Sequence, residues 1–416
     1  MTNALDLLAT LGELDDWTAA HTTWRAESTL NLNAATNTMS DRARAALATS
    51  LADKGISSGL HSRHHFGGRF IDQIEARVER VANDLFGAAA VDLRPMSGSL
   101  ANAIVLAGAD PKRPIVTGDR RTLGHLSFSA SGWGGRLAAD VLALPFAADG
   151  VTVDLAELAV LVARYQPSLI VLGSQAMLFP IDLPGVRAVA GGTGVVYDAA
   201  HPLGLIAGGG FQDPLREGAD IVTASTQKSL PGPVGGLILT RTTELMAPLY
   251  TLSNALLSNY QNNRVLSLGY TLLEMAAFGR QYADACVRNA RALATALAEQ
   301  GLMPLFAERG FTESNQLLLP WGEKSAADAF AARCEQADII VSTIRLPSGT
   351  DGPARYGSRI GVQDVTRCGI DPALLPEVAA LLAALARGAP LEPVAERATA
   401  LARELRTPRY TFENQT

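Results

Sequence analysis

The sequence has few charged residues and no long apolar run. Asp, Glu, Lys and Arg make up 18% of the 416 residues, and the formal net charge is −6. A net negative charge argues against the strongly basic surface that nucleic-acid-binding proteins use. No apolar run approaches the roughly 20 residues of a membrane span, and the N-terminus lacks the basic-then-apolar order of a signal peptide. We therefore expect a cytoplasmic protein whose partners include neither nucleic acid nor a membrane.

Cysteine is also scarce. The three cysteines, Cys286, Cys334 and Cys368, are widely spaced and match neither a metal motif nor a disulfide framework. They are compatible with a reducing compartment, and no metal site is expected. The length of the chain, in contrast, allows more than one hydrophobic core, so two domains are the default expectation.

Short apolar segments alternate with amphipathic segments along most of the chain. Residues 72–86 have apolar positions spaced three to four apart, which predicts a helix. The strand candidates are mostly β-branched and apolar on both faces, which predicts a largely parallel sheet covered by helices. These candidates are residues 115–117, 141–144, 169–172, 194–197, 221–223 and 236–239.

The C-terminal third has a different pattern. The Ala- and Leu-rich residues 267–300 predict a long helix that can connect two domains. Two short strand candidates, 316–319 and 339–341, and a helix at 372–386 follow, as is typical of a smaller α+β domain. The predicted division is an N-terminal arm at residues 1–40 that packs on a partner, a large domain at 41–285 and a small C-terminal domain at 286–416.

One lysine lies in a setting that suits covalent chemistry. Lys228 follows the apolar residues 220–224 and stands among small hydroxylated residues before the Gly/Pro-rich turn 231–236. A Schiff-base enzyme needs an amine held at a fixed point with little bulk around it. Asp198 ends another apolar segment, where a partner for a pyridinium nitrogen would be placed. Together they indicate pyridoxal phosphate (PLP), although each motif alone also fits an exposed loop or a helix cap.

Motifs in a fixed order extend this interpretation over most of the chain. From Asn31 to Ala386 they resemble the serine hydroxymethyltransferase family of fold-type I PLP enzymes, a group that is aspartate-aminotransferase-like. The ordered set carries the resemblance, since no single motif is decisive. The matching segments are residues 66–68, 85–88, 95–102, 198–201, 226–236, 359–361 and 366–369.

The resemblance implies both a fold and an activity. The fold is α/β, with a mainly parallel seven-stranded sheet in the large domain and a smaller C-terminal α+β domain. The family consists of homodimers with active sites at the subunit interface. The implied activity is PLP-dependent chemistry at Cα of an amino acid, foremost Cα–Cβ cleavage or formation by an aldolase, transaldolase or hydroxymethyltransferase. Decarboxylation, side-chain elimination or racemisation of a specialised amino acid is the alternative, and a PLP-binding regulator without catalysis is a third possibility.

The resemblance also assigns roles to single residues. Ser97, Gly98 and Ser99 precede a helix expected to start near residue 101, so their N–H groups and hydroxyls can cradle the cofactor phosphate. A simple N-cap is the competing interpretation. By the resemblance, His125 stacks on the pyridine ring, Asp198 keeps the ring nitrogen protonated, and His201 lies near the phenolic oxygen. Thr226 and Lys228 contact the cofactor, and Arg359 clamps the substrate carboxylate. Asn262 approaches the phosphate of the neighbouring subunit.

Several positions depart from the family pattern. Ile56 and Ser58 replace the tyrosine and glutamate of a Tyr-x-Glu motif, and Phe66 replaces a second tyrosine. These polar groups act on the leaving hydroxymethyl oxygen or in the folate step, so we expect a loss of folate dependence. The remaining departures are Ala35 for a serine near the carboxylate site, Gln227 for the histidine before the lysine, and residues 259–263 for a Gly-Gly-Gln-Gly-Gly loop.

A histidine cluster offers a substitute for the missing carboxylate. His61, His64 and His65 are three of the six histidines and lie directly before Phe66. A neutral imidazole can transfer protons near pH 7. Successive side chains of an extended segment face opposite ways, and we favour His65 as the catalytic and substrate-contacting residue beside Phe66. Water held by Ser58 is another proton source. A surface cluster and a metal site are the competing interpretations.

Overall fold

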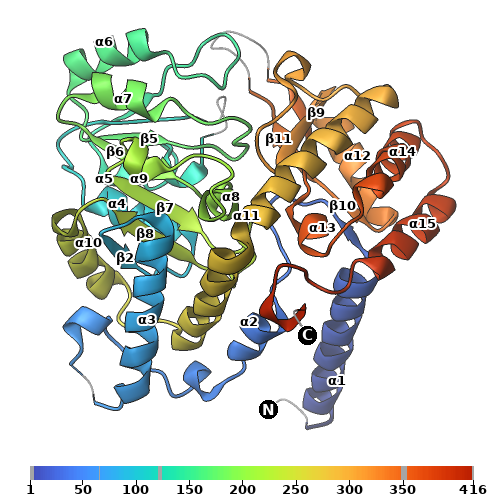
Figure 1. Ribbon diagram of the computed structural model, residues 1–416, viewed down its shortest axis with the longest axis horizontal. Helices are drawn as coiled ribbons and strands as arrows, with labels where there is room; N and C mark the ends of the chain where they lie inside the picture. Colours follow the sequence, from blue (N-terminus) through green and yellow to red (C-terminus); the bar gives the residue numbers. More distant parts are fainter. Residues whose placement is uncertain (1–3, 65, 120–123, 348–353, 415–416) are drawn as a thin grey trace.

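The structure, a computed structural model, describes residues 4–64, 66–119, 124–347 and 354–414 (Figure 1). Its largest sheet has seven strands in the order β2-β8-β7-β6-β5-β3-β4, all parallel to their neighbours except β8, which is antiparallel to both β2 and β7. The predicted mainly parallel sheet is therefore confirmed. The strands are β2 (Ala90–Asp92), β3 (Ile115–Thr117), β4 (Val141–Ala143), β5 (Leu169–Leu172), β6 (Gly194–Asp198), β7 (Ile221–Ser225) and β8 (Gly236–Thr240).

Helices cover both faces of this sheet because its strands are apolar on both sides. Ile170 and Leu172 of β5 belong to one core cluster, whereas Leu169 and Val171 belong to another on the opposite face, as the two-residue side-chain period of a strand requires. The first cluster includes residues of α3 (Arg69–Phe86), α7 (Leu183–Ala190) and α11 (Asn262–Glu299). The second includes residues of α4 (Gly98–Ala107) and α10 (Thr243–Leu256).

The C-terminal part forms a smaller body beside the large sheet (Figure 1). A three-stranded antiparallel sheet has the order β11-β12-β9. Leu30 and Leu32 belong to the core of this body, so this short part of the predicted arm packs with the small domain. The elements here are β9 (Gln316–Gly322), β11 (Ser342–Arg345), β12 (Tyr356–Gly361), β1 (Leu30–Asn31) paired with β10 (Ile339–Ile340), and the helices α12 (Lys324–Gln336), α13 (Gln363–Arg367), α14 (Leu375–Ala386) and α15 (Leu391–Glu404).

The helix α11 joins the two bodies. Its buried residues from Val265 to Cys286 belong to the core of the large sheet, and those from Ala290 to Leu297 belong to the core of the smaller body. The predicted long connecting helix is thus confirmed, with a start five residues earlier than expected. Although α11 has 38 residues, no helix within the described ranges is long and apolar enough to cross a membrane.

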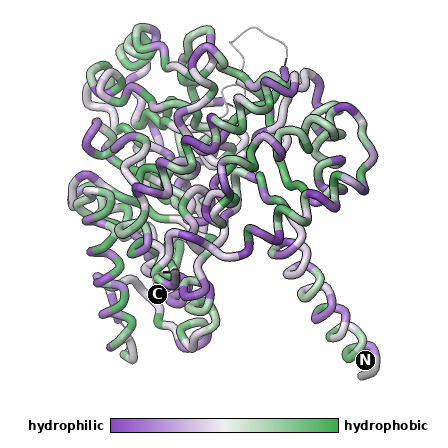
Figure 2. Tube along the Cα trace, turned by 45° about the vertical axis from the view of Figure 1, so that its right-hand side comes forward, coloured by the Kyte–Doolittle hydropathy of each residue, from purple (hydrophilic) through white to green (hydrophobic). Residues whose placement is uncertain are grey.

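The N-terminal helix α1 (Ala4–Thr23) stands clear of the rest of the chain (Figure 2). Isolated helices gain little stability from local propensity, and most of a helix's stability comes from packing of an apolar face. Apolar side chains of α1 are instead left in solvent. Leu7, Leu8, Leu11, Leu14 and Trp17 are each more than half exposed.

A fully buried ion pair fixes α13 against α11. Arg367 of α13 and Glu274 of α11 form a salt bridge, and their side chains are 0% and 2% exposed. The Arg367 guanidinium also donates to the carbonyl of Tyr410 over 2.8 Å. Burial raises the pKa of Glu274, and the nearby Arg367 acts in the opposite direction. The pair holds the C-terminal segment to the long helix.

We predict that Arg367→Met lowers stability strongly, because it leaves the Glu274 carboxylate buried without its cation. Removal of one partner of a buried pair costs about 3–5 kcal/mol. The midpoint of thermal denaturation of the variant is the measurement. Lys324→Met is the matched control, because Lys324 pairs with Asp328 on the surface and exposed pairs contribute little. Equal midpoints for the two variants would contradict the prediction.

Candidate active site

The carboxyl ends of two adjacent strands bring together the predicted aspartate and lysine. Asp198 is the last residue of β6, and Lys228 lies three residues beyond the end of β7. The two strands are parallel neighbours. In open α/β sheets, ligands bind outside the carboxyl ends of the strands. Both residues therefore lie at the edge where a ligand is expected.

The loop after β7 is held rigidly. Thr226 is completely buried. Its N–H donates to the carbonyl of Gly235 over 3.1 Å, and its hydroxyl donates to the carbonyl of Pro233 over 2.6 Å. The side-chain amide of Asn37 donates to the carbonyl of Lys228 over 2.7 Å. The Thr226 hydroxyl thus secures the loop, and the backbone of Lys228 is fixed from two sides.

Lys228, His201 and Arg359 meet at one point. The Lys228 Nζ atom lies 3.2 Å from His201 Nε2. A guanidinium nitrogen of Arg359 lies 3.3 Å from the same Nε2 atom and donates to the carbonyl of Gln175 over 2.6 Å. His201 and Arg359 are buried. The structure therefore brings together three of the residues that the sequence analysis assigned to cofactor and substrate.

Burial sets the charge state of this group. It lowers the pKa of Lys228 to about 8, with Asp198 raising that pKa and Arg359 lowering it further. Burial also lowers the pKa of Arg359 to about 10, so the guanidinium stays charged near neutral pH. The pKa of His201 lies well below its usual range because of burial and because Lys228 and Arg359 lie nearby. A neutral imidazole therefore stands between a cation and an amine that releases its proton readily.

A second network joins Asp198 to His125. Asp198 accepts hydrogen bonds from the N–H of Ala200 over 2.9 Å and from the amide of Asn102 over 3.1 Å. That amide also donates to Ser127 Oγ over 2.9 Å. His125 Nδ1 accepts from the N–H of Ser127 over 3.2 Å, and Ser127 Oγ lies 2.7 Å away. Since a backbone N–H only donates, neutral His125 carries its proton on Nε2, and burial lowers its pKa.

The segment expected to bind phosphate forms the start of α4, three residues earlier than predicted. The Ser97 hydroxyl caps this helix by accepting from the N–H of Leu100 over 3.1 Å. A Cβ atom added at Gly98 would lie 2.4 Å from Ser225 Oγ, so only glycine fits there. Ser99 and His125 line a cavity of about 420 Å³. A helix N-terminus open to such a cavity suits an anion.

These groups fit PLP. The lysine can bind the aldehyde carbon, the aspartate can pair with the ring nitrogen, and the N-terminus of α4 can hold the phosphate. Gly98, where a Cβ would collide with Ser225, lets the start of α4 pack directly against the end of β7 and so keeps this helix N-terminus beside the lysine loop. The donors and acceptors of the site thus match the three polar ends of this cofactor.

Other predicted site residues lie elsewhere in the chain. Asn262, the first residue of α11, accepts from the N–H of Ile56 over 2.8 Å and donates to Glu75 over 2.9 Å. The carbonyl of Ser58 accepts from the Tyr260 hydroxyl over 3.4 Å. Figure 1 shows this region at the end of the molecule opposite the small domain. Within the described residues, none of these contacts involves Lys228.

Two members of the histidine cluster, His61 and His64, make no hydrogen bond to the lysine among the described residues. His61 Nε2 lies 2.9 Å from a carboxylate oxygen of Glu79, which makes His61 a surface partner of α3. His64 is exposed, and the Phe66 side chain is fully exposed. His65, the favoured catalytic histidine, lies outside the described residues. No group of three or more His, Cys, Asp or Glu residues in the described part of the chain could hold a metal ion.

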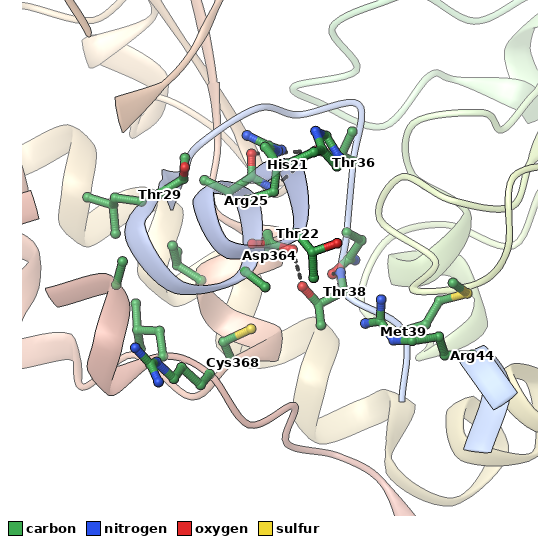
Figure 3. A pocket seen from close by; sticks show the side chains of 18 residues that line it. His21, Thr22, Arg25, Thr29, Thr36, Thr38, Met39, Arg44, Asp364 and Cys368 are labelled. Atoms are coloured by element: carbon green, nitrogen blue, oxygen red, sulfur yellow. Dashed lines mark hydrogen bonds between the residues drawn. The ribbon is translucent and has the colours of Figure 1, made fainter. Parts of the chain in front are cut away.

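A separate cavity of about 290 Å³ is lined by side chains from the N-terminal region and the C-terminal part of the chain (Figure 3). Arg25 of η1 (Trp24–Ser28), Arg44 and Asp364 line it, and the Asp364 carboxylate accepts from the Thr38 hydroxyl over 2.8 Å. Asn37, which holds the Lys228 carbonyl, forms part of the same wall. None of the predicted site residues lines this cavity, so it is distinct from the catalytic group.

Three polar residues of the site escaped the sequence analysis. Asn102 and Ser127 link Asp198 to His125, and Gln316 places its side-chain amide 2.9 Å from His201 Nδ1. Asn102 closes one of the motifs that carried the resemblance, so its position was a usable signal. Gln316 gave only a weak signal, as a polar residue at the start of an apolar strand.

Comparison with known proteins agrees with this geometry. The family model described as serine hydroxymethyltransferase matches residues 13–382. The serine hydroxymethyltransferase of Pyrobaculum calidifontis is 35% identical over 387 residues, covering 90% of this chain and 89% of the relative. That of Thermococcus gammatolerans is 36% identical over 372 residues, covering 86% of each chain.

A solved structure is also similar over the whole length. The L-threonine transaldolase of Pseudomonas fluorescens, in its internal aldimine state, matches with a TM-score of 0.90 and 27% identity. The match covers 100% of this chain and 97% of that one. The fold-type I architecture inferred from the motifs is therefore confirmed. The chain belongs to the serine hydroxymethyltransferase family.

Proposed function

We infer that the protein is a PLP-dependent enzyme that breaks or forms the Cα–Cβ bond of an amino acid, as serine hydroxymethyltransferases and transaldolases do. The observation that carries this conclusion is the position of Lys228 Nζ, 3.2 Å from His201 and at the same sheet edge as Asp198. The family membership and the transaldolase neighbour support the same reaction class.

Each charged residue of the site has a separate role in the proposed reaction. When bound, PLP supplies an electron sink for the bond that breaks at Cα. Asp198 would hold a proton on the ring nitrogen, and the lowered pKa of Lys228 makes its ammonium give up a proton more readily than an exposed lysine does. Arg359 holds the substrate carboxylate, since it remains a cation in a buried position. Ser99 and the N-terminus of α4 bind the phosphate.

The carboxylate clamp favours this reaction over decarboxylation and over a purely regulatory role. Decarboxylation requires the carboxylate to leave its cation, whereas a buried Arg359 holds it in place. A regulator that merely binds PLP has no need of a substrate clamp. Arg359 and Lys228 therefore both support catalysis at the Cα–Cβ bond.

We propose that the working form is a homodimer whose sites contain residues of both chains. The supporting observations are the exposed apolar face of α1 and the fully exposed Phe66. Ser58 contacts Tyr260, and Asn262 contacts Glu75 of α3, so both bond within their own chain and not to the lysine site. In a two-fold dimer the same surfaces of two chains contribute reciprocally, so this loop can complete the site of the partner. A cytoplasmic location stays a prediction.

Lys228 is predicted to be the residue that binds PLP covalently, because its amine alone lies beside His201 at the carboxyl edge of the sheet. Borohydride reduction of the holoenzyme followed by peptide mapping should place the label on Lys228. The variant Lys228→Ala should take up no label. A label on a different lysine would contradict the cofactor site.

Tetrahydrofolate is predicted not to stimulate the enzyme markedly. Ile56, Ser58 and Phe66 lack the polar groups that the family uses around folate and the transferred one-carbon unit. Conversion of serine to glycine is measured with and without added folate. A large folate-dependent rate that saturates would show that other residues have taken over this task.

His65→Ala is predicted to lower turnover by about 10²–10⁴-fold, the range typical of lost acid–base catalysis. The covalent label on Lys228 should survive, because His65 is not part of the lysine loop. His64→Ala is the matched control and should have a much smaller effect. Normal turnover in both variants would show that the histidine cluster is a surface feature without a catalytic role.

A mixing experiment tests whether the loop acts on the partner's site. Lys228→Ala and His65→Ala chains are co-refolded or co-expressed in equal amounts. If the loop works across the interface, mixed dimers have one intact site, and about a quarter of the wild-type turnover returns in a symmetric dimer. If the loop serves its own chain, no turnover returns, which would refute the shared site.

A further inference from the structure

Two neighbouring strands of the small sheet direct polar side chains at the same imidazole. Gln316 of β9 lies opposite Gly361 of β12, and Arg359 is two residues before Gly361. Residues two apart on a strand, and residues directly opposite on a paired strand, share one face of the sheet. Gln316 and Arg359 therefore lie on the same face, and both contact His201, at Nδ1 and Nε2 respectively.

The donors around His201 determine where its proton lies. A guanidinium has donors and no acceptor, so the Nε2 atom facing Arg359 at 3.3 Å must accept. The imidazole is neutral, because burial and the nearby Lys228, Arg359 and His125 lower its pKa. Its single proton therefore lies on Nδ1, which needs an acceptor. Against these effects, a backbone hydrogen bond with Ala34 raises the pKa of His201, so the Ala34 carbonyl is a second acceptor near the ring, beside the Gln316 side chain.

Gln316 provides that acceptor if its oxygen faces the ring. With its Nε2 group toward His201 Nδ1 at 2.9 Å, two donors would face each other, and Gln316 Oε1 is then buried without a hydrogen-bond partner. If the Gln316 side-chain amide is flipped by 180°, its oxygen faces His201 Nδ1–H, so the two donors no longer meet and the buried oxygen gains a hydrogen bond. Gln316 is itself completely buried, so no solvent competes for this contact.

We propose that Gln316 is a positioning residue that accepts a hydrogen bond from His201 Nδ1–H and so keeps the lone pair of Nε2 directed at Lys228 and Arg359. In this state His201 separates two cationic side chains without adding a third charge. Its Nε2 lone pair can accept a hydrogen bond from the Lys228 ammonium over 3.2 Å, which holds the lysine side chain at a fixed position. The proposal rests on the proposed function for its catalytic consequence, but the tautomer itself does not depend on which amino acid reacts.

The first measurement is the tautomer of His201 in the wild-type holoenzyme. Nitrogen-15 NMR of histidine-labelled protein, assigned with a His201→Gln variant, distinguishes a protonated Nδ1 from a protonated Nε2. We expect the proton on Nδ1. A proton on Nε2 would overturn the proposal whether or not the enzyme acts on any tested substrate, so this result is separate from the fate of the proposed function.

Two variants then test the role of the contact. Gln316→Met keeps the shape but offers no oxygen, so turnover should fall by about 10–100-fold, as for lost partners that orient a functional histidine, with KM for the amino acid little changed. Gln316→Glu accepts the same hydrogen bond but adds a negative charge, which favours the imidazolium. The pKa of His201 should rise, and the acidic limb of the pH profile of kcat should move to higher pH.

Gln212→Met is the control for the loss of a buried glutamine. Gln212 is buried and accepts from the Tyr197 hydroxyl over 2.9 Å, away from His201. We expect it to affect stability and to leave the His201 tautomer and the pH profile of kcat unchanged. If Gln316→Glu leaves the His201 pKa unchanged, or if Gln316→Met behaves like the control, Gln316 only fills space and the proposal fails.

Discussion

The shared imidazole of His201 is the contact on which the catalytic group depends. Lys228 and Arg359 both approach its Nε2 atom, and burial makes a charge on either of them costly. The group therefore contains two cationic side chains, Lys228 and Arg359, and only one nearby carboxylate, Asp198. The N-terminus of α4 adds a positive dipole end at the same edge. A ligand with a phosphate and a carboxylate supplies the missing negative charges, which is the reason that a PLP–amino acid pair suits this site.

The fold supplies these groups from two bodies. The large sheet provides the lysine and the aspartate at the ends of β7 and β6, and the small sheet provides Arg359 from β12. The relative position of the two bodies determines whether the carboxylate clamp meets the lysine. α11 contributes to the cores of both, and the Arg367–Glu274 pair fastens α13, which directly follows β12 and Val362, to this helix. Packing far from the chemistry thus sets the geometry of the substrate clamp.

The sequence sufficed for those features that local patterns encode. Six of the seven strands of the large sheet follow from short apolar runs, whereas β2 has only three residues and ends in the charged Asp92, so no pattern revealed it. The lysine and the aspartate were recognisable because each ends an apolar strand. Contacts between distant segments were not recognisable: Gln316 meets His201 across 115 positions of the chain. Leu30 lies in the small-domain core for a similar reason, since its strand pairs with β10.

Three of the departures from the family pattern, Ile56, Ser58 and Phe66, lie in one loop that its own chain holds firmly. Arg63 donates to the carboxylate of Glu75 over 2.7 Å and to the carbonyl of Ser57 over 3.2 Å. Ser58 has a φ of 65°, a left-handed conformation that costs a non-glycine residue free energy and persists where its surroundings impose it. A loop stabilised in this way keeps its shape when its outward residues change. The fully exposed Phe66 can therefore differ from the family pattern without disturbing Lys228 and Asp198 at the edge of the sheet.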